Sequence, residues 1–370
     1  GGRSLGGRCF SETWDMRAHQ MRGALKITKG QPSEASTVHF DTGCQWFTAQ
    51  DPSFVEELRA WCDDGIAAQW HGVHVGSWDT RGRRFEALSP KDLPPIFAGV
   101  GGMGSITEGL ARDLGEANMT FAVARSFSRN PTTGKYTLSI EVDQANSHLS
   151  FIGGNLPQES ESRVLDGEFD YVVMAPGLAA KQPRMVEFNN SAAQDIVDLL
   201  RDHMRYQTMM MLTLVFDRSL PLPFDICKPD RIGPIGLVIR ASGKPGMSGG
   251  DQLETWTVCA SAALARRYAL PKLKNDGLKE LTNAFFDTFD VASFRRHLVS
   301  NHGTPFGLLW PHGQPLMKLP GDQRAIFSQE AQVGLCADYC GGLPCVESAT
   351  VSALVLADAM AAHRDGGTLL

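Results

Sequence analysis

Apolar residues recur at helical spacing in two stretches of the first third of the chain. They are Phe54, Leu58 and Trp61 in the first stretch, and Ile106, Leu110 and Leu114 in the second. The first stretch follows Asp51-Pro52-Ser53, and proline suits the first turn of a helix because its φ is already fixed. The spacing predicts two amphipathic helices, and we expect a third over residues 347–363.

Short apolar runs between turn-forming residues predict the strands. These runs lie within residues 38–48, 120–128, 136–142, 169–175, 209–216 and 253–260. The second and third form a hairpin around Asn130–Gly134, and 169–175 is expected to be a buried strand ended by Pro176-Gly177. Residues 25–36 and 233–250 are predicted to be mostly loop. Mixed strands and helices favour a mixed α/β fold in two interleaved domains over a simple βαβ array.

Composition and charge narrow the class of protein. With 42% hydrophobic and 21% charged residues in 370, the chain is an ordinary globular protein, not a disordered, collagen-like or coiled-coil one. A net charge of -6 disfavours nucleic acid as a partner. No run reaches the roughly 18 apolar residues of a membrane span, so no membrane association is expected. Eight scattered cysteines favour free thiols in a reducing compartment, such as cytoplasm or an organelle matrix, over secretion.

A literal G-x-G-x-x-G pattern occurs at Gly99, Gly101 and Gly104. It could hold a dinucleotide pyrophosphate at a helix N-terminus, with Arg125 reading a 2′-phosphate. However, Pro94-Pro95 precedes it where a central strand should be. We interpret it as a glycine-lined turn, and an NADP-binding protein remains the alternative.

Other motifs are interpreted as ordinary structural features rather than as metal-binding or catalytic sites. Cys336, Cys340 and Cys345 lack paired zinc spacing and are expected to be buried thiols near a turn. His71 and His74 are expected to be solvated. The G-x-S-x-G letters at 246–250 lack the strand and helix of a nucleophile elbow, and no Walker loop is present.

Two segments resemble the renalase-like branch of the FAD-dependent amine oxidase superfamily. Residues 3–9, Arg-Ser-Leu-Gly-Gly-Arg-Cys, match the second half of its K-S-R-G-x-G-G-R-M segment. Residues 40–54, F-D-T-G-C-Q-W-F-T-A-Q-D-P-S-F, match its F-D-H-G-A-Q-Y-F-T-A-R-D-P-x-F segment. Weaker matches lie at 101–105, 171–176 and in the tail over 336–353. The resemblance therefore spans nearly the whole chain.

The resemblance implies bound FAD and a set of residues around it. The FAD-binding residues it suggests are Gly6, Gly7, Arg8, Gln45, Phe47, Val123, Asp338, Glu347, Ser348, Ala349 and Thr350. The glycine pair and Arg8 would approach the pyrophosphate and ribityl chain, while Gln45 and Phe47 would lie near the isoalloxazine ring. The backbone of Val123 would contact adenine, and Asp338 would accept from a ribityl or ribose hydroxyl.

The tail would act on the flavin through backbone N–H groups around Ser348–Thr350. They open the last predicted helix, whose positive end would favour negative charge on the reduced ring. Three tail residues depart from the pattern by replacing glycines, namely Ala337, Ser348 and Ala353. An added Cβ near a ligand is expected to weaken binding.

The domains implied by the resemblance are discontinuous. A Rossmann-like FAD-binding domain of the amine oxidase type would comprise 1–52, 98–185 and 328–370. A substrate domain built on a mixed or antiparallel sheet would comprise 53–97 and 186–327. The dinucleotide fingerprint and ribose-binding acid would precede Gly1, so we expect this chain by itself to bind FAD poorly and to fold badly.

The resemblance also implies the chemistry. An FAD-dependent oxidoreductase would take hydride from a small organic donor, a dihydronicotinamide or an amine, and pass electrons to O2. No catalytic side chain is assigned, no metal is expected, and the oligomeric state is left open. The rival hypothesis is a non-enzymatic family member that no longer binds FAD.

Overall fold

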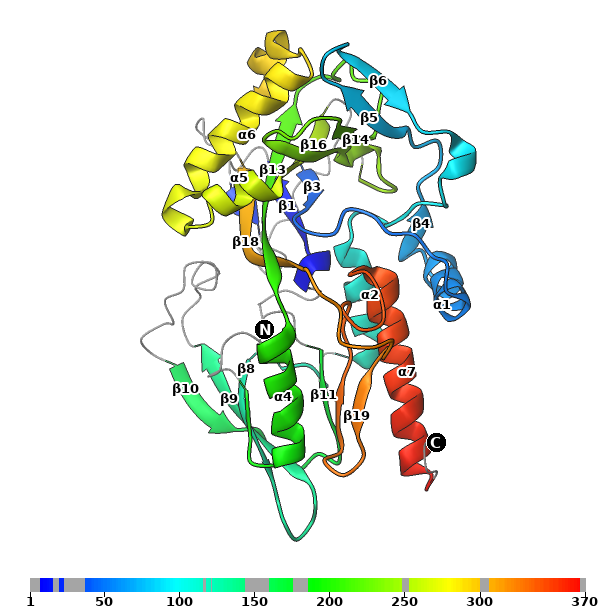
Figure 1. Cartoon of the computed structure of the whole chain (residues 1–370), viewed down its shortest axis with the longest axis vertical. Helices are drawn as coiled ribbons and strands as arrows, with labels where there is room; N and C mark the ends of the chain where they lie inside the picture. The colour runs from blue at the N-terminus through cyan, green and yellow to red at the C-terminus, as the bar shows by residue number, and fades with distance from the viewer. Residues whose placement is uncertain are drawn as a thin grey trace.

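The computed structural model describes residues 7–15, 20–22, 37–115, 118–120, 122–143, 160–175, 186–247, 253–299 and 306–366. Within them the fold is mixed α/β, as predicted, with several separate sheets. Figure 1 shows two lobes joined by a narrower waist, with the largest sheet in the upper lobe. The helix α7 and the hairpin of β8 and β9 lie in the lower lobe. Gly6, the predicted loop over 25–36 and the predicted strand end at Pro176-Gly177 lie outside the described residues.

Helices that the pattern predicts are found close to their expected positions. The α-helices of the described residues are α1 (Pro52–Asp63), α2 (Gly104–Leu114), α4 (Ser191–His203), α5 (Ala262–Arg267), α6 (Lys274–Thr288) and α7 (Val346–Arg364). Helix α1 is capped by Asp51, whose side chain accepts from the Ser53 N–H at 3.0 Å. It buries Phe54, Leu58 and Trp61, so the predicted stripe is confirmed. Among the described residues, no helix combines the length and the apolar run that crossing a bilayer requires.

The stripe predicted for α2 is wrong at two of its three positions. Leu110 and Leu114 are 44% and 62% exposed, whereas Ile106 is buried. The helix turns its small residues inward instead, and a Cβ on Gly109 would lie 2.6 Å from Ile66 Cδ1. Close packing on Ile66 therefore decides which face is buried, and leucine spacing alone does not reveal it.

The upper lobe is built on an eight-stranded sheet in the order β17-β13-β16-β15-β14-β5-β6, with β18 also paired to β13. Its strands are β5 (Val75–Asp79), β6 (Arg84–Ala87), β13 (Tyr206–Phe216), β14 (Ile226–Pro229), β15 (Ile235–Arg240), β16 (Glu254–Ala260), β17 (Leu298–Val299) and β18 (Phe306–Pro315). Most neighbours are antiparallel, and only β14 and β5 run parallel. The core strand predicted over 209–216 lies inside β13, and that over 253–260 coincides with β16.

Strand β15 corrects the prediction that 233–250 is mostly loop. It lies between β14 and β16, and Val238 and Ile239 are fully buried within it. The glycines and prolines on both sides dominate the local composition and hide a six-residue strand with four apolar side chains. Two neighbouring strands supply the hydrogen bonds that make this segment a strand.

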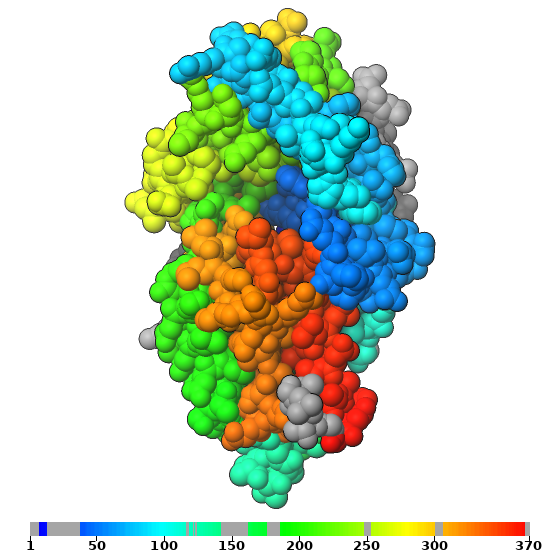
Figure 2. All heavy atoms as spheres, turned by 45° about the vertical axis from the view of Figure 1, so that its right-hand side comes forward, coloured from blue at the N-terminus to red at the C-terminus, as the bar shows by residue number. Residues whose placement is uncertain are grey.

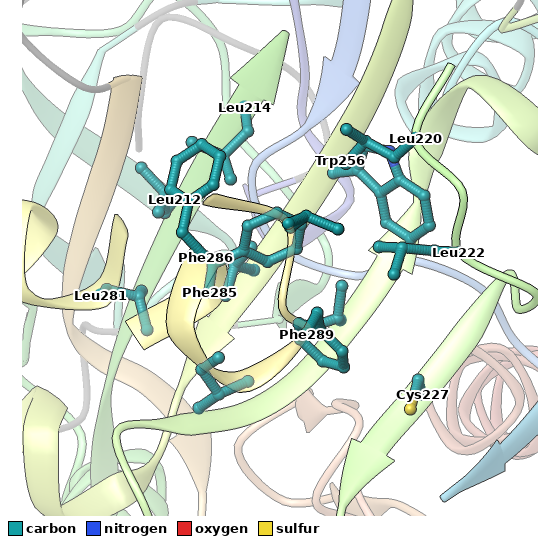
Figure 3. Packing of buried hydrophobic residues seen from close by; sticks show 14 of the residues in the cluster. Leu212, Leu214, Leu220, Leu222, Cys227, Trp256, Leu281, Phe285, Phe286 and Phe289 are labelled. Atoms are coloured by element: carbon teal, nitrogen blue, oxygen red, sulfur yellow. The ribbon is translucent and has the colours of Figure 1, made fainter. Parts of the chain in front are cut away.

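The upper core fills the face of this sheet that α5 and α6 cover. Figure 3 shows Leu212 and Leu214 of β13 packed near Phe285 and Phe286 of α6, with Trp256 of β16 beside them. The opposite face of the sheet packs against β3 (Thr37–Asp41), where Val38 and Phe40 meet Val215. Because both faces of the sheet are covered, strand β13 appears in the sequence as a nearly continuous apolar run over 209–216 rather than as an alternation of apolar and polar residues.

The lower lobe holds two smaller sheets. In one, β11 (Val172–Met174) and β20 (Val333–Leu335) run parallel, with β19 (Ile326–Ser328) antiparallel to β20. The other has the order β10-β9-β8-β12 and contains β8 (Val123–Arg129), β9 (Tyr136–Asp143), β10 (Ser160–Val164) and β12 (Glu187–Phe188). The predicted hairpin is thereby confirmed. The predicted burial of β11 is wrong at Val173, which is 48% exposed.

Short strands and turns connect the lobes at the waist. They are β1 (Ser11–Asp15) and β2 (Gln20–Arg22), which pair with each other while β1 also pairs with β3. A separate two-stranded antiparallel sheet is formed by β4 (Ala67–Gln69) and β7 (Phe97–Gly99). Figure 2 shows a hollow between the lobes with blue N-terminal segments at its back. Orange and red segments form its lower rim, so early and late parts of the chain meet there.

Candidate functional site

Arg8 connects the beginning of the chain to its tail. It lies in η1 (Gly7–Cys9), which Gly7 opens with a φ of +50°. Its Nη2 donates to Asp338 Oδ1 at 2.7 Å, and its Nη1 donates to the carbonyl of Gly313 at 3.4 Å. The side chains of Arg8 and Asp338 are 28% and 14% exposed. Two predicted site residues therefore form an ion pair that solvent still reaches.

The turn after β3 lies directly against the backbone of Arg8. The N–H of Cys44 donates to the Arg8 carbonyl at 2.6 Å. A Cβ on Gly43 would lie 2.2 Å from that same oxygen, so only glycine allows this approach. The Nε1 of Trp310 donates to the carbonyl of Thr42 at 2.6 Å and holds the turn from the upper sheet. The two segments that carry the family resemblance are thus in contact.

A buried ion pair lies behind this turn. Lys244 Nζ donates to Asp41 Oδ2 at 2.8 Å, and both side chains are wholly inaccessible to solvent. Asp41 Oδ1 also accepts from the Ser11 hydroxyl at 2.5 Å and from the Met103 N–H at 2.8 Å. A buried charge needs such partners because it has lost its water. The pair joins β3, the glycine turn before α2 and the loop after β15.

Gln45 completes this buried network. Its Oε1 accepts from Lys244 Nζ at 2.8 Å, and its Nε2 donates to the carbonyls of Asp41 and Gly43 at 2.9 and 3.1 Å. All of these bonds are to the protein itself. The predicted neighbour of a flavin ring is therefore held in one orientation, and its contact with flavin stays a prediction.

The G-x-G-x-x-G turn binds protein groups. The N–H of Gly101 donates to the Pro245 carbonyl at 2.9 Å, and that of Gly104 to the Ser11 hydroxyl at 2.8 Å. The Met103 N–H donates to Asp41 Oδ1, so the start of α2 faces the Asp41 carboxylate. Arg125 is already paired with Glu141 on the neighbouring strand. A carboxylate in the place of a phosphate argues against the alternative of NADP binding at Gly99–Gly104.

The first turn of α7 makes several contacts of its own. Glu347 Oε1 accepts from the Gln50 N–H at 2.9 Å and from the Asp51 N–H. The Ser348 N–H donates to Cys345 Sγ at 3.3 Å, and the Ala349 N–H donates to the Cys345 carbonyl at 3.2 Å. The Ser348 and Ala349 groups predicted to face the flavin are thus engaged in capping, and their role toward a flavin stays a prediction.

Two hydroxyls of this turn also bond within the tail. The Ser348 hydroxyl donates to the Leu343 carbonyl at 2.8 Å, and the Thr350 hydroxyl donates to the Val346 carbonyl at 3.0 Å. The tail before α7 is tied to the helix as well, since the Ala337 N–H donates to the Ser352 hydroxyl at 3.0 Å. The segment carrying Asp338 is therefore held against α7.

Phe47 belongs to a hydrophobic core cluster, and Val123 belongs to a strand of the lower lobe. Phe47 is 3% exposed, stacks on Phe97 at 6.0 Å between ring centroids, and packs on Phe54. Its side chain belongs to the core beside α1. Val123 begins β8 and pairs with Glu141 in the lower lobe. Their predicted contacts with flavin and adenine stay predictions.

Burial raises the pKa of two tyrosines near Arg8 and Asp338. It raises the pKa of Tyr206 to about 12, while the charge of Arg8 opposes the shift. It raises the pKa of Tyr339 far beyond its ordinary value.

The remaining sequence candidates carry no site. Within the described ranges, no group of three or more His, Cys, Asp or Glu side chains is placed to hold a metal ion. Cys336 and Cys340 are buried thiols, as predicted, whereas Cys345 is exposed. His74 is exposed but lies 3.3 Å from Asp225, a pairing that the sequence did not suggest.

Asp41 and Lys244 are the residues that sequence reasoning missed. Asp41 stands inside the matched segment, but nothing there indicated that it would be buried. Lys244 lies between Gly243 and Pro245 in a stretch predicted to be loop. The one available signal was a single charged residue in an otherwise uncharged turn.

Comparisons with known proteins give little beyond this geometry. No family model matches the chain, and no curated protein matches it. Among solved structures, the chain is similar to a candidate protoporphyrinogen oxidase from Exiguobacterium sp. 255-15, with 13% identity and a TM-score of 0.43. The match covers 74% of this chain and 53% of the other, so the chain spans about half the length of that structure.

Proposed function

We propose that this protein is an FAD-dependent oxidoreductase of the renalase-like branch of the amine oxidase superfamily. The observation that carries the proposal is the ion pair between Arg8 and Asp338, which lies beside a turn that only Gly43 permits. These residues come from three distant parts of the chain that the resemblance had connected with one cofactor. A scatter of these residues over separate surfaces would have argued against it.

The groups at this place suit a dinucleotide. A partly exposed guanidinium can bind a phosphate through its forked N–H groups. The Asp338 carboxylate can accept hydrogen bonds from the hydroxyls of a ribityl chain or ribose. The absence of a side chain at Gly43 lets the turn lie directly against the backbone of Arg8. The donor set therefore fits FAD, with Arg8 and Asp338 as the residues that would hold it.

FAD would supply a two-electron acceptor for a hydride from a small organic donor, a dihydronicotinamide or an amine, with O2 as the final acceptor. The chain's own residues would bind and orient. Arg8 would neutralise phosphate charge, and Asp338 would fix the hydroxyl-bearing chain. The sealed network of Asp41, Lys244 and Gln45 would keep the turn rigid and exclude water behind it.

The test is to purify the protein from its complete coding sequence and record the visible absorbance of bound flavin. We expect the unaltered protein and Arg83→Ala to retain flavin, because Arg83 is an exposed arginine paired with Asp290 on the surface. Arg8→Ala should lose most of it. A colourless protein that also fails to bind added FAD would overturn the proposal, and so would full retention by Arg8→Ala.

A further inference from the structure

Cys9 and Cys44 bring two thiols together from distant parts of the chain. Their side chains are hydrogen-bonded to each other. The bond between the Cys44 N–H and the Arg8 carbonyl fixes the two backbones beside that contact. Cys44 Sγ also lies 3.3 Å from the Trp46 carbonyl, which restrains the sulfur. Both cysteines are free, and each residue is partly exposed.

The two thiols differ in acidity. The hydrogen bond from Cys44 lowers the pKa of Cys9, and the charge of Arg8 lowers it further, against the effects of burial and of Asp41. The same hydrogen bond and burial raise the pKa of Cys44 well above its ordinary value. Cys9 is thus the more readily deprotonated thiol of the pair and the one suited to attack an oxidant, and Cys44 lies beside it as the partner thiol.

Cysteines elsewhere are less suited to the same reaction. Burial raises the pKa of Cys227 and of Cys259 to about 12, and of Cys336 to about 11. A thiol that stays protonated is a poor nucleophile. Cys9 should therefore react with a mild oxidant before these three thiols.

We propose that Cys9 and Cys44 form a reversible disulfide when the protein meets hydrogen peroxide. The Cys9 thiolate attacks one peroxide oxygen, the O–O bond breaks, and the departing hydroxide takes a proton to become water. The resulting Cys9 sulfenic acid is attacked by the Cys44 sulfur, so that the S–S bond forms and the S–O bond breaks. Water leaves with the Cys44 proton. Two thiols are oxidised, and one peroxide is reduced to two waters.

The disulfide would join the segment of Arg8 covalently to the turn that carries Gly43 and Gln45. Both sides of the candidate site would then be linked independently of any ligand. The proposal does not rest on the proposed function, because it needs only the two thiols and peroxide. Its test can fail while flavin binding stands, and the reverse also holds.

The test uses the full chain, reduced, freed of reductant and treated with hydrogen peroxide. Remaining thiols are then alkylated, and the digest is searched by mass spectrometry for a peptide linking Cys9 to Cys44. We expect this peptide in large excess over any other linked pair, an intact mass lower by two hydrogen atoms, and reversal by dithiothreitol. The unfolded chain in urea should not show this preference.

Three variants assign the roles. In Cys44→Ser the reaction should stop at a Cys9 sulfenic acid that dimedone labels, and in Cys9→Ser dimedone should not label Cys44. Cys62→Ser, which removes a thiol from α1, should form the link like the unaltered protein. Free Cys9 and Cys44 after peroxide has oxidised other cysteines would overturn the proposal. So would an equal yield of the link in urea, and the unaltered chain decides both outcomes without the variants.

Discussion

Two ion pairs, each between one acidic and one basic side chain, lie on either side of the turn after β3. They differ in how much of each side chain is exposed to solvent. Asp41 and Lys244 are sealed, with both side chains at 0% exposure, whereas Arg8 and Asp338 are 28% and 14% exposed. The sealed pair has additional partners in Ser11 and Gln45. The open pair joins η1, near the start of the described chain, to the segment before α7.

The difference in burial indicates which ion pair stabilises the turn and which ion pair can bind a ligand. A sealed pair cannot exchange its partner for a ligand, and removing one member leaves a buried charge with no compensation. An open pair is screened by water, adds little to stability, and can turn its charges to a ligand. The sealed pair therefore maintains the turn, and the open pair is the part suited to recognition.

The largest effect is expected from breaking the sealed pair. Lys244→Met should lower the free energy of unfolding by roughly 3–5 kcal/mol, because the Asp41 carboxylate stays buried without its cation. Urea unfolding followed by circular dichroism measures this. Lys228→Met, at an exposed lysine, is the matched control and should change little. A loss below about 1 kcal/mol for Lys244→Met would mean that the pair is not sealed in solution.

For the open pair of Arg8 and Asp338, we expect a small effect on stability and a larger effect on FAD binding. Asp338→Asn is expected to change the free energy of unfolding by less than about 1 kcal/mol. The same change should weaken FAD roughly 10- to 100-fold, since a charge-assisted hydrogen bond contributes about 1.5–3 kcal/mol. Urea unfolding and a fluorescence titration with FAD give the two numbers. Equal losses in both would remove the distinction between the pairs.

Glu12 tests what a buried carboxylate does without a close cation. Burial raises its pKa to about 7, and the charge of Lys274 opposes the rise only in part. The folded protein then holds a proton that the unfolded chain releases near pH 4.5, so stability falls as pH rises from about 4.5 to 7.

We expect this fall to be about 1–2 kcal/mol once partial solvent access is allowed for. Glu12→Gln should remove that part of the pH dependence, as measured by urea unfolding at several pH values between 4 and 8. An unchanged slope in the variant would show that another group titrates in this range.

The smallest effect is expected at the first turn of α7. Glu347 accepts two N–H groups from Gln50 and Asp51 through one charged oxygen. Glu347→Gln keeps the acceptor and removes the charge, so a loss of about 0.5–1.5 kcal/mol in unfolding free energy is expected. Thermal unfolding measures it, and Glu56→Gln on the exposed face of α1 is the control. A larger loss than for Lys244→Met would reverse the order of these effects.

The local sequence pattern was enough to predict the elements whose stabilising contacts lie between residues close together in the chain. The capped start of α1, its buried stripe, the β8–β9 hairpin and α7 could all be predicted, because each follows from neighbouring residues. It was not enough for β15, whose identity as a strand depends on β14 and β16. Nor did it reveal the buried face of α2, which is set by contact with Ile66.

The site divides in the same way. Arg8 and Asp338 were suggested as site residues by the family resemblance, and their capacity to bind phosphate and hydroxyl groups follows from their side chains. The partnership of Asp41 with Lys244, and that of Cys9 with Cys44, depend on segments that only the folded chain brings into contact. Residue types and local spacing are properties of the sequence, whereas burial and partners at long range arise when chain segments pack and water is excluded between them.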